Sequence, residues 1–214
     1  MQNITQVNNG AVASRRWWGV AGWVERVLSD PWLYDQIQRR CGLDETRRRL
    51  EPHLADSAGR RVLDVGAGTG NYTALLPRDA SYFWLDRDPL KLRRFRAKHP
   101  TAKALLSDAT HLALASKSVD CTICVALSHH IPDAGLPRLL AEVARVTRTT
   151  LIFVDAVERK RSLAAAVLWK LDRGSHPRPA ATLLSAISES FAVDHVERYG
   201  SQHHYILCVA HPSS

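Results

Sequence analysis

Short apolar runs, separated by stretches of mixed polar and apolar residues, recur along the middle of the chain. Runs that alternate with helix-forming segments are typical of βαβ units, in which parallel strands form a sheet that helices cover on both faces. The pattern therefore predicts an α/β fold with a doubly wound, mostly parallel sheet. We expect the first five strands at residues 61–65, 81–86, 103–107, 119–126 and 149–155.

The pattern changes toward the C-terminal end. Helices are expected over 161–171 and 179–189, and two further strands over Phe191–Arg198 and His203–Ala210. The short connection Tyr199-Gly200-Ser201-Gln202 between these strands can join only antiparallel neighbours. The sheet is thus predicted to have seven strands, with an antiparallel last strand.

Residues ahead of the first strand show helical spacing. Apolar positions recur in this way over Trp17–Leu28, Asp30-Pro31 interrupts them, and the spacing resumes over Trp32–Arg40 and Asp44–Glu51. The predicted organisation is a disordered tail over residues 1–14, a helical cap over 15–56 and one sheet-containing domain over 57–214.

The predicted cap is rich in tryptophan, with Trp17, Trp18, Trp23 and Trp32. Tryptophans on amphipathic helices pack against a core, line a substrate pocket or touch a membrane surface, and the sequence leaves these roles open. The longest apolar window near the N-terminus is much shorter than the roughly 20 residues that a membrane-spanning helix needs. We therefore expect no transmembrane segment and no signal peptide, while peripheral contact with a membrane stays open.

The chain carries an excess of positive charge. Its formal net charge is +8, which is compatible with nucleic acid or an anionic membrane as a partner. The densest basic group falls on the helix expected after the second strand, and it lacks a regular interleaving with aromatic side chains that could stack on bases. A solvated helix face is the favoured interpretation, and nucleic acid is not the favoured partner. The group consists of Arg87, Lys91, Arg93, Arg94, Arg96 and Lys98.

Four cysteines are present in the chain. Cys121 and Cys124 have the spacing of a redox or zinc motif, but both lie in the predicted fourth strand, without a second pair at metal-binding spacing. We interpret them as structural thiols in a reducing cytoplasm. The expectation is a cytoplasmic protein without a bound metal.

Residues 62–70, Val-Leu-Asp-Val-Gly-Ala-Gly-Thr-Gly, join the first predicted strand to three alternate glycines. Gly66, Gly68 and Gly70 have no Cβ, which lets backbone N–H groups approach a ligand, and the helix expected after the turn would offer its N-terminus to negative charge. A dinucleotide fingerprint would require glycine where the chain has Asn71. The motif therefore predicts a nucleotide site of another kind.

This glycine turn, preceded by an acid and followed by acids at the ends of the next two strands, resembles the first motifs of the class I S-adenosylmethionine-dependent methyltransferases. The resemblance rests on Asp64 two residues before the first glycine, on Asp86 at the end of the second predicted strand and on Asp108 just after the third. It implies S-adenosyl-L-methionine as the cofactor. Asp64 would orient the glycine turn and the amino-acid end of the cofactor, Asp86 would bind the ribose diol, and Asp108 would recognise adenine. The implied cofactor-binding residues are Asp64, Gly66, Ala67, Gly68, Gly70, Asp86, Arg87, Asp108, Ala109 and Leu127.

Histidines supply the candidate chemistry. Methyl transfer is an in-line displacement, and a hydroxyl or acidic carbon acceptor must lose a proton to a group such as histidine. His129 and His130 follow the fourth strand, at the carboxyl edge where open α/β folds bind their ligands. One of these two histidines is the candidate base.

Candidate substrate contacts lie further along the chain. His176 and Arg178 occupy the loop before the helix expected at 179–189, and an arginine there could hold an anionic group by bidentate hydrogen bonds. His203 and His204 begin the last predicted strand, and we expect them at the opposite edge of the sheet, away from the site.

The sequence thus predicts a methyltransferase that acts on a small organic acceptor, such as a metabolite, quinone, lipid or glycoside, with O-methylation favoured. Leu127-Ser128-His129-His130 stands where similar nucleic-acid enzymes carry an Asn/Asp-Pro-Pro-Tyr/Phe motif or a Pro-Cys nucleophile. The alternatives are an RNA methyltransferase and a non-catalytic protein that binds S-adenosylmethionine. The oligomeric state is left open.

Overall fold

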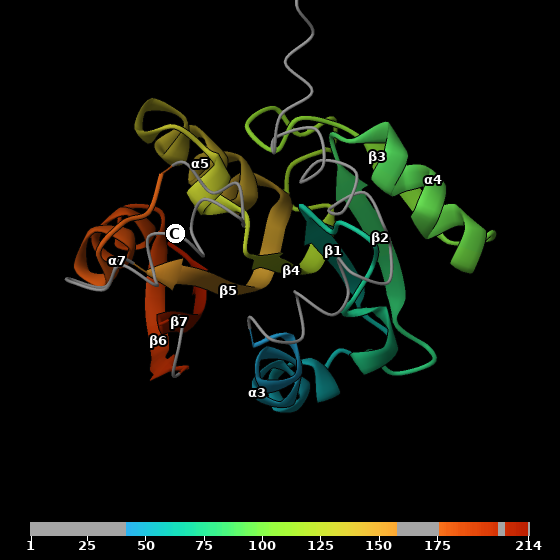
Figure 1. Cartoon of the computed structure of the whole chain (residues 1–214), viewed down its shortest axis with the longest axis horizontal. Coiled ribbons are helices and arrows are strands. Elements are labelled where there is room, and N and C mark those ends of the chain that lie inside the picture. Colours follow the sequence, from blue (N-terminus) through green and yellow to red (C-terminus); the bar gives the residue numbers. More distant parts are fainter. Residues whose placement is uncertain (1–41, 158–175, 201–203, 214) are drawn as a thin grey trace, which may run out of the picture. The chain divides into compact units, whose positions relative to one another are not determined.

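The computed structural model describes residues 42–157, 176–200 and 204–213, which contain a seven-stranded sheet with helices on both of its faces (Figure 1). The sequence predicted each of these strands close to its observed limits. The strands are β1 (Arg61–Val65), β2 (Ser81–Asp86), β3 (Lys103–Leu106), β4 (Val119–Val125), β5 (Thr147–Val157), β6 (Phe191–Tyr199) and β7 (His204–Pro212).

The strands follow the order β3-β2-β1-β4-β5-β7-β6. β1 to β5 pair in parallel, whereas β7 is antiparallel to both β5 and β6. The direction of winding reverses between β1 and β4, and open α/β sheets bind their ligands outside the strand ends at such a point. The mixed sheet with its reversed last strand confirms the predicted fold class.

The helices divide between the two faces. Leu54 of one helix packs with Val62 of β1, and Phe95 of another packs with Trp84 of β2. Trp84 pairs with Asp64, which points to the same face as Val62 because side chains alternate along a strand. These two helices therefore cover one face, and the other two helices cover the opposite face. The helices are α3 (Leu43–Ala55) and α4 (Pro89–Lys98) on the first face, and α5 (Leu136–Val146) and α7 (Ala180–Ser188) on the second.

The helix expected directly after the glycine turn is not formed, and this prediction was wrong. Only a short 3-10 helix, η1 (Thr73–Leu75), lies between β1 and β2. Leu76 is extended, with φ −83° and ψ 145°, as is typical of a residue before proline, and Pro77 would break a helix at this point. The glycine turn therefore has no helix N-terminus behind it.

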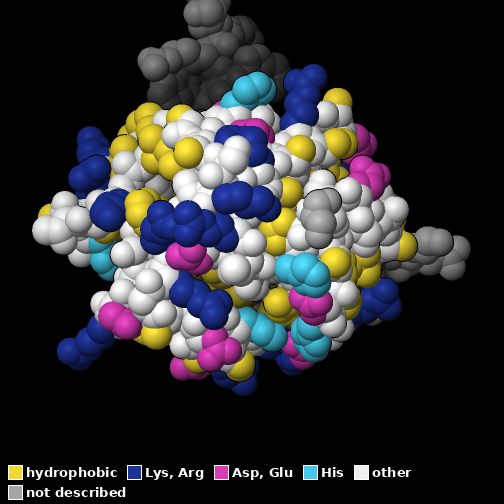
Figure 2. Space-filling model, turned by 180° about the vertical axis from the view of Figure 1, so that it is seen from behind, with side chains coloured by type: hydrophobic (Ala, Val, Ile, Leu, Met, Phe, Trp, Pro, Cys, Tyr) yellow, Lys and Arg dark blue, Asp and Glu magenta, His cyan; other side chains and the backbone are white. Residues whose placement is uncertain are grey.

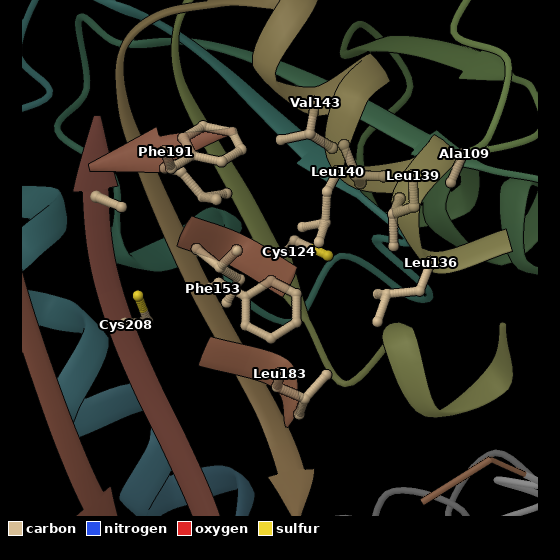
Figure 3. Close-up of a cluster of buried hydrophobic side chains, with 14 of the residues drawn as sticks. Ala109, Cys124, Leu136, Leu139, Leu140, Val143, Phe153, Leu183, Phe191 and Cys208 are labelled. Atoms are coloured by element: carbon tan, nitrogen blue, oxygen red, sulfur yellow. The ribbon is translucent and has the colours of Figure 1, made fainter. Parts of the chain in front are cut away.

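The larger core cluster lies between the sheet and α5. The buried residues of α5 recur at helical spacing, and Figure 3 shows several of them gathered near Cys124 and Phe153 of the central strands. Burial raises the pKa of Cys121 to about 12 and that of Cys208 to about 11. These thiols are neutral near pH 7, which fits core packing. The buried residues of α5 are Leu136, Leu139, Leu140, Val143 and Val146.

Basic side chains form several separate groups on the surface in Figure 2, and acidic side chains lie beside some of them. At the amino edge of the sheet, for example, Arg61 Nε lies 3.6 Å and Arg148 Nη1 3.5 Å from the carboxylate of Asp120. Among the described helices, none is long and apolar enough to cross a membrane.

Several predictions concern parts of the chain outside the described residues. These are the tail over 1–14, the tryptophan-bearing part of the cap, the helix at 161–171, and His203. The described part of the predicted cap is α3, which begins beside Gly42 and buries Leu50 and Leu54 against the sheet.

Candidate functional site

Parallel pairing brings the carboxyl ends of five strands to one edge of the sheet. Val65 of β1 pairs with both Leu85 of β2 and Cys124 of β4, while β3 ends beside β2 and β5 beside β4. Most of the predicted cofactor residues and both candidate histidines follow these strand ends directly. Residues from distant parts of the sequence therefore lie along a single edge.

Hydrogen bonds fasten the glycine turn to β2. The N–H groups of Gly66 and Ala67 donate to the carbonyl of Leu85 at 2.8 and 2.9 Å. The indole Nε1–H of Trp84 donates to the carbonyl of Gly68 at 2.9 Å. The turn is therefore held in one conformation by the neighbouring strand.

Two of the glycines are needed for different reasons. Gly68 has φ +57° and Gly70 has φ +80°, in the left-handed region that favours glycine. A Cβ at Gly70 would lie 2.6 Å from Cδ2 of Phe95, whereas among the described residues the nearest atom to a Cβ at Gly68 would be the Gly66 carbonyl oxygen, at 4.0 Å. Packing excludes a side chain at Gly70, while the described part of the chain leaves the space beside Gly68 open.

Asp86 ends β2 with its carboxylate against the glycine turn. This residue is 5% exposed; Oδ2 accepts from the N–H of Gly68 and Oδ1 from that of Asp88, both at 3.0 Å. Lys91 Nζ lies 3.4 Å from Oδ2. The backbone thus holds a carboxylate, an acceptor of hydrogen bonds, directly beside the open space at Gly68.

Asp108 lies just after β3 and is exposed. Its Oδ1 accepts from the N–H and the hydroxyl of Thr110, both at 2.8 Å. These two hydrogen bonds hold the pKa of Asp108 below its usual value, and the bond from the backbone N–H has the larger effect. The charge of Arg87 lowers the pKa further. The side chains of Ala67 and Ala109 are buried in the core, so any contact of theirs with a ligand would use the backbone.

Asp64 lies inside β1 and is 1% exposed. Burial raises its pKa to about 7; a 2.6 Å hydrogen bond from the Tyr82 hydroxyl opposes this rise, and the charge of Asp86 adds to it. The hydrogen bonds of the glycine turn described above go to β2 and Asp86. The predicted role of Asp64 in orienting the turn therefore stays a prediction.

A sharp turn ends β4. Ala126 has φ +52°, a left-handed conformation that costs a residue other than glycine about 1 kcal/mol. Leu127 then packs against Gly66, where a Cβ would lie 2.9 Å from Cδ1 of Leu127. The 3-10 helix η2 (Ser128–His130) follows. The strained residue thus directs the chain so that both candidate histidines lie at the carboxyl edge.

Asp155 of β5 is fully buried and accepts hydrogen bonds from η2 and from its own strand. Its Oδ2 accepts from the Ser128 hydroxyl and the N–H of His129, and its Oδ1 contacts Nδ1 of His129 and accepts from the N–H of Ala156 at 2.7 Å. Burial by itself raises the pKa of Asp155. The contact with His129 and the hydrogen bonds outweigh burial and hold the pKa below its usual value, so Asp155 is ionised near pH 7.

The two candidate histidines differ in access. His129 is 2% exposed and is directed toward Asp155. His130 is half-buried, and its ring centroid lies 4.2 Å from that of His129. Of the two imidazoles, that of His130 has the access that proton transfer from an external acceptor requires.

Arg178 lies against the same loop and is 5% exposed. Its guanidinium donates to the carbonyls of Ser128 at 2.8 Å and Ile131 at 2.6 Å, and to the carboxylate of Asp133 at 2.9 Å. The N–H of His176 donates to the carbonyl of His129 at 3.0 Å. Both predicted substrate residues thus lie beside the histidines, and Arg178 holds the loop in place.

His204 lies at the site edge of the sheet, which corrects our expectation for this residue. It pairs with Val157 at the carboxyl end of β5, and Tyr205 pairs with Ala156. The cause is the reversed direction of β7, because the first residues of an antiparallel strand lie beside the last residues of its neighbour. His203 lies outside the described residues.

Sequence reasoning did not single out Asp155 as part of the site. Its signal was available, since an acid ends the apolar run of β5 much as Asp86 ends that of β2. Among the described residues, no group of three or more histidine, cysteine, aspartate or glutamate side chains is arranged to hold a metal.

A family model of the methyltransferase domain matches residues 62–150, which include the glycine turn, Asp86, Asp108 and both histidines. An uncharacterized methyltransferase of Mycobacterium tuberculosis (strain ATCC 25618 / H37Rv) is 40% identical over 96 residues, 44% of this chain and 38% of the relative. A fatty-acid O-methyltransferase of Mycolicibacterium smegmatis is 34% identical over 132 residues, 56% of this chain and 47% of the relative. The chain thus spans about two fifths to one half of the length of these relatives.

Solved structures show the same fold. The geranyl diphosphate C-methyltransferase of Streptomyces coelicolor A3(2), solved with S-adenosyl-L-homocysteine, matches with a TM-score of 0.67 at 10% identity, over 79% of this chain and 77% of that one. Three observations point to the same fold. They are the order of the strands, the glycine turn with its three acids, and the family match over residues 62–150. The chain therefore has the fold of the solved methyltransferases, and over residues 62–150 it is similar to the methyltransferase domain family.

Proposed function

We propose that the protein transfers the methyl group of S-adenosylmethionine to a small organic acceptor, with oxygen as the favoured acceptor atom. The observation that carries this proposal is the pairing of Asp86 with the glycine turn beside the open space at Gly68. A carboxylate that is already held there by backbone N–H groups can accept hydrogen bonds from a ribose diol without having to reorient.

The cofactor fits the chemistry of the residues at this edge. Gly68 leaves room for close approach, Asp86 would accept from the ribose hydroxyls, and Asp108 would accept from the adenine amino group. Arg87 is exposed next to Asp86, where its stem could cover the adenine face. Leu127, between the glycine turn and η2, would pack beside the methionine end. When bound, S-adenosylmethionine supplies a methyl group that is activated by a positively charged sulfonium.

The acceptor would bind where η2, His176 and the start of β7 meet the same edge. His130 is the candidate base because it is more accessible than His129, which is buried against Asp155. Oxygen as the acceptor atom is supported by the presence of a candidate base, which a hydroxyl acceptor needs. Separately, a relative of similar sequence is named as a fatty-acid O-methyltransferase. The sequence alternative of an RNA substrate has no support from the described contacts.

The first experiment tests cofactor binding at Asp86. Asp86→Asn removes the charge but keeps the shape of the side chain, and we expect S-adenosylmethionine to bind about 10-fold to 100-fold more weakly in titration calorimetry, as for the loss of a charged hydrogen bond. Asp79→Ala, at an exposed position on the β1–β2 connection, is the control and should keep full affinity. Equal affinity in all three proteins would overturn the assignment of Asp86.

A second experiment separates transfer from mere binding and identifies the acceptor. The protein is incubated with methyl-labelled S-adenosylmethionine and fractionated cell extract, and labelled products are identified by mass. We expect a labelled small molecule together with S-adenosylhomocysteine. Binding without formation of S-adenosylhomocysteine would favour the non-catalytic alternative, and label in RNA would favour the nucleic-acid one.

A further inference from the structure

We propose that Asp155 and His129 are positioning residues that turn His130 into an effective base, and that the acceptor is therefore a hydroxyl compound rather than a carboxylic acid. The inference rests on the proposed function and names its substrate class. It is carried by the hydrogen bonds around Asp155, by the contact of the two imidazoles and by the balance of charge around the η2 loop.

The carboxylate of Asp155 determines the orientation of the His129 ring. An ionised carboxylate can only accept hydrogen bonds, so the Nδ1 atom that contacts Oδ1 of Asp155 carries a proton. The Ser128 hydroxyl and the N–H of His129 hold the other carboxylate oxygen. Both the ring and the backbone of His129 are thereby locked, and His130 follows it directly in the same 3-10 helix.

Charged groups on the neighbouring elements do not cancel the negative charge of Asp155. The guanidinium of Arg178 contacts this loop, and the carboxylate of Asp133 lies 2.7 Å from it. Arg178 and Asp133 thus balance each other. His176 contacts the loop through its backbone N–H. The buried charge of Asp155 then favours a positive charge on the tilted, contacting pair of imidazoles, which is the charge that a base acquires.

This arrangement suits one class of acceptor. A carboxylic acid is already ionised near pH 7 because its pKa is about 4, so it needs no base, and the negative Asp155 behind the histidines would disfavour its charge. A phenol, with a pKa of about 10, and an aliphatic alcohol keep their protons and need a base. A negatively charged site wall behind a basic imidazole therefore fits a neutral hydroxyl group.

The reaction step balances as follows for a hydroxyl acceptor. Its oxygen forms a bond to the methyl carbon while the carbon–sulfur bond breaks and leaves its electron pair on sulfur. The hydroxyl proton moves to a ring nitrogen of His130, and the resulting imidazolium is stabilised by Asp155 through His129. Release of the proton to water restores the base.

The first test reads the imidazoles without any acceptor. In the full chain labelled with ¹³Cε1-histidine, the signal of His130 is assigned by its loss in His130→Gln, and its titration is followed by NMR in the wild type and in Asp155→Asn. We expect the midpoint of His130 to fall by about one pH unit in Asp155→Asn, because the loss of a nearby buried negative charge lowers the pKa of a histidine. An unchanged midpoint in a folded variant would overturn the proposal.

Two further measurements keep the test decisive. Asp194→Asn is the matched control, since it removes the charge of a carboxylate that lies 3.0 Å from another histidine, the exposed His211; it should leave the midpoint of His130 unchanged. If Asp155→Asn does not fold, the wild type alone is informative, because a proton on Nδ1 of His129 held by Asp155 should give a strongly downfield N–H signal in ¹⁵N-labelled protein. Absence of that N–H signal at low temperature would count against the proposed hydrogen bond between His129 and Asp155.

An activity arm separates this inference from the proposed function. The wild type is given S-adenosylmethionine with a panel of simple phenols and long-chain alcohols, or with long-chain fatty acids. Methyl ethers support the inference when their rate of formation falls in Asp155→Asn and the rising limb of its pH profile moves to lower pH together with the midpoint of His130. Methyl esters would overturn it while leaving the proposed function intact, and a loss of cofactor binding in calorimetry would overturn the proposed function itself.

Discussion

Gly68 and Gly70 share a left-handed backbone but differ in what surrounds them, so the same substitution should have different effects. Gly70→Ala would place its Cβ against the Phe95 ring and should lower the free energy of unfolding by about 2 to 4 kcal/mol. Gly68→Ala should cost roughly 1 kcal/mol in stability but weaken cofactor binding, because its methyl group would enter the open space. Urea unfolding and calorimetry on both variants check this, and a cofactor defect without a stability difference between them would contradict it.

Asp64 gives stability a pH dependence of its own. Its pKa in the folded protein is about 7, above its value in the unfolded chain, so its favourable contribution is complete below about pH 4 and is lost as the pH rises through 7. Asp64→Asn should therefore be stabilising at pH 8 relative to its effect at pH 5, by about 2 to 3 kcal/mol. Urea unfolding at the two pH values measures this difference.

Asp120 provides the matched control for that experiment. Its pKa is held below the usual value, chiefly by the hydrogen bond from the N–H of Arg61, so it is ionised at both pH 5 and pH 8. Asp120→Asn should therefore change stability by the same amount at the two pH values. A pH-independent effect of Asp64→Asn would show that the buried carboxyl does not titrate in this range.

At the scale of elements, Arg178 joins the segment before α7 to the loop after β4. Its planar fork reaches two carbonyls and a carboxylate at once, a geometry that a lysine cannot reproduce. Arg178→Lys should lower the methyl transfer rate about 10-fold to 100-fold through misplacement of His130, and cofactor affinity should change less than about twofold. Single-turnover assays and calorimetry distinguish the two quantities.

Arg148→Lys is the control for this clamp. Arg148 is a partly exposed arginine at the amino edge of the sheet, where it lies beside Asp120. It should keep both the rate and the affinity of the wild type. A rate for Arg178→Lys equal to that of the control would mean that the loop keeps its position without the guanidinium.

At the scale of the whole molecule, the sheet was predictable from the sequence because apolar runs and glycine punctuation are local signals. The strand limits, the reversed last strand and α7 follow from them. The missing helix after the glycine turn was not predicted, since motif resemblance favoured a helix where Pro77 and a short connection prevent one. The local pattern also could not show on which edge His204 would lie, because that depends on which strand β7 pairs with.

The candidate site was predictable only in part for the same reason. The glycine turn, Asp86 and Asp108 are recognisable because their spacing along the chain is short. The distinction between His129 and His130 depends on Asp155, which is 26 residues away in sequence from His129. The clamp by Arg178 spans 50 residues to Ser128. Such long-range pairs leave no periodic signal in a single sequence.

The order of the strands also separates two tasks in space. Apart from Leu127, the residues proposed to hold the cofactor lie in or directly after β1, β2 and β3, on one side of the switch point. The 3-10 helix η2 follows β4, and Asp155 and His204 lie in β5 and β7, on the other side. A lineage could therefore exchange its acceptor by altering one half of the sheet while the other half continued to bind the same methyl donor. For protein engineering, the β6–β7 hairpin is consequently the place to vary when new acceptors are sought.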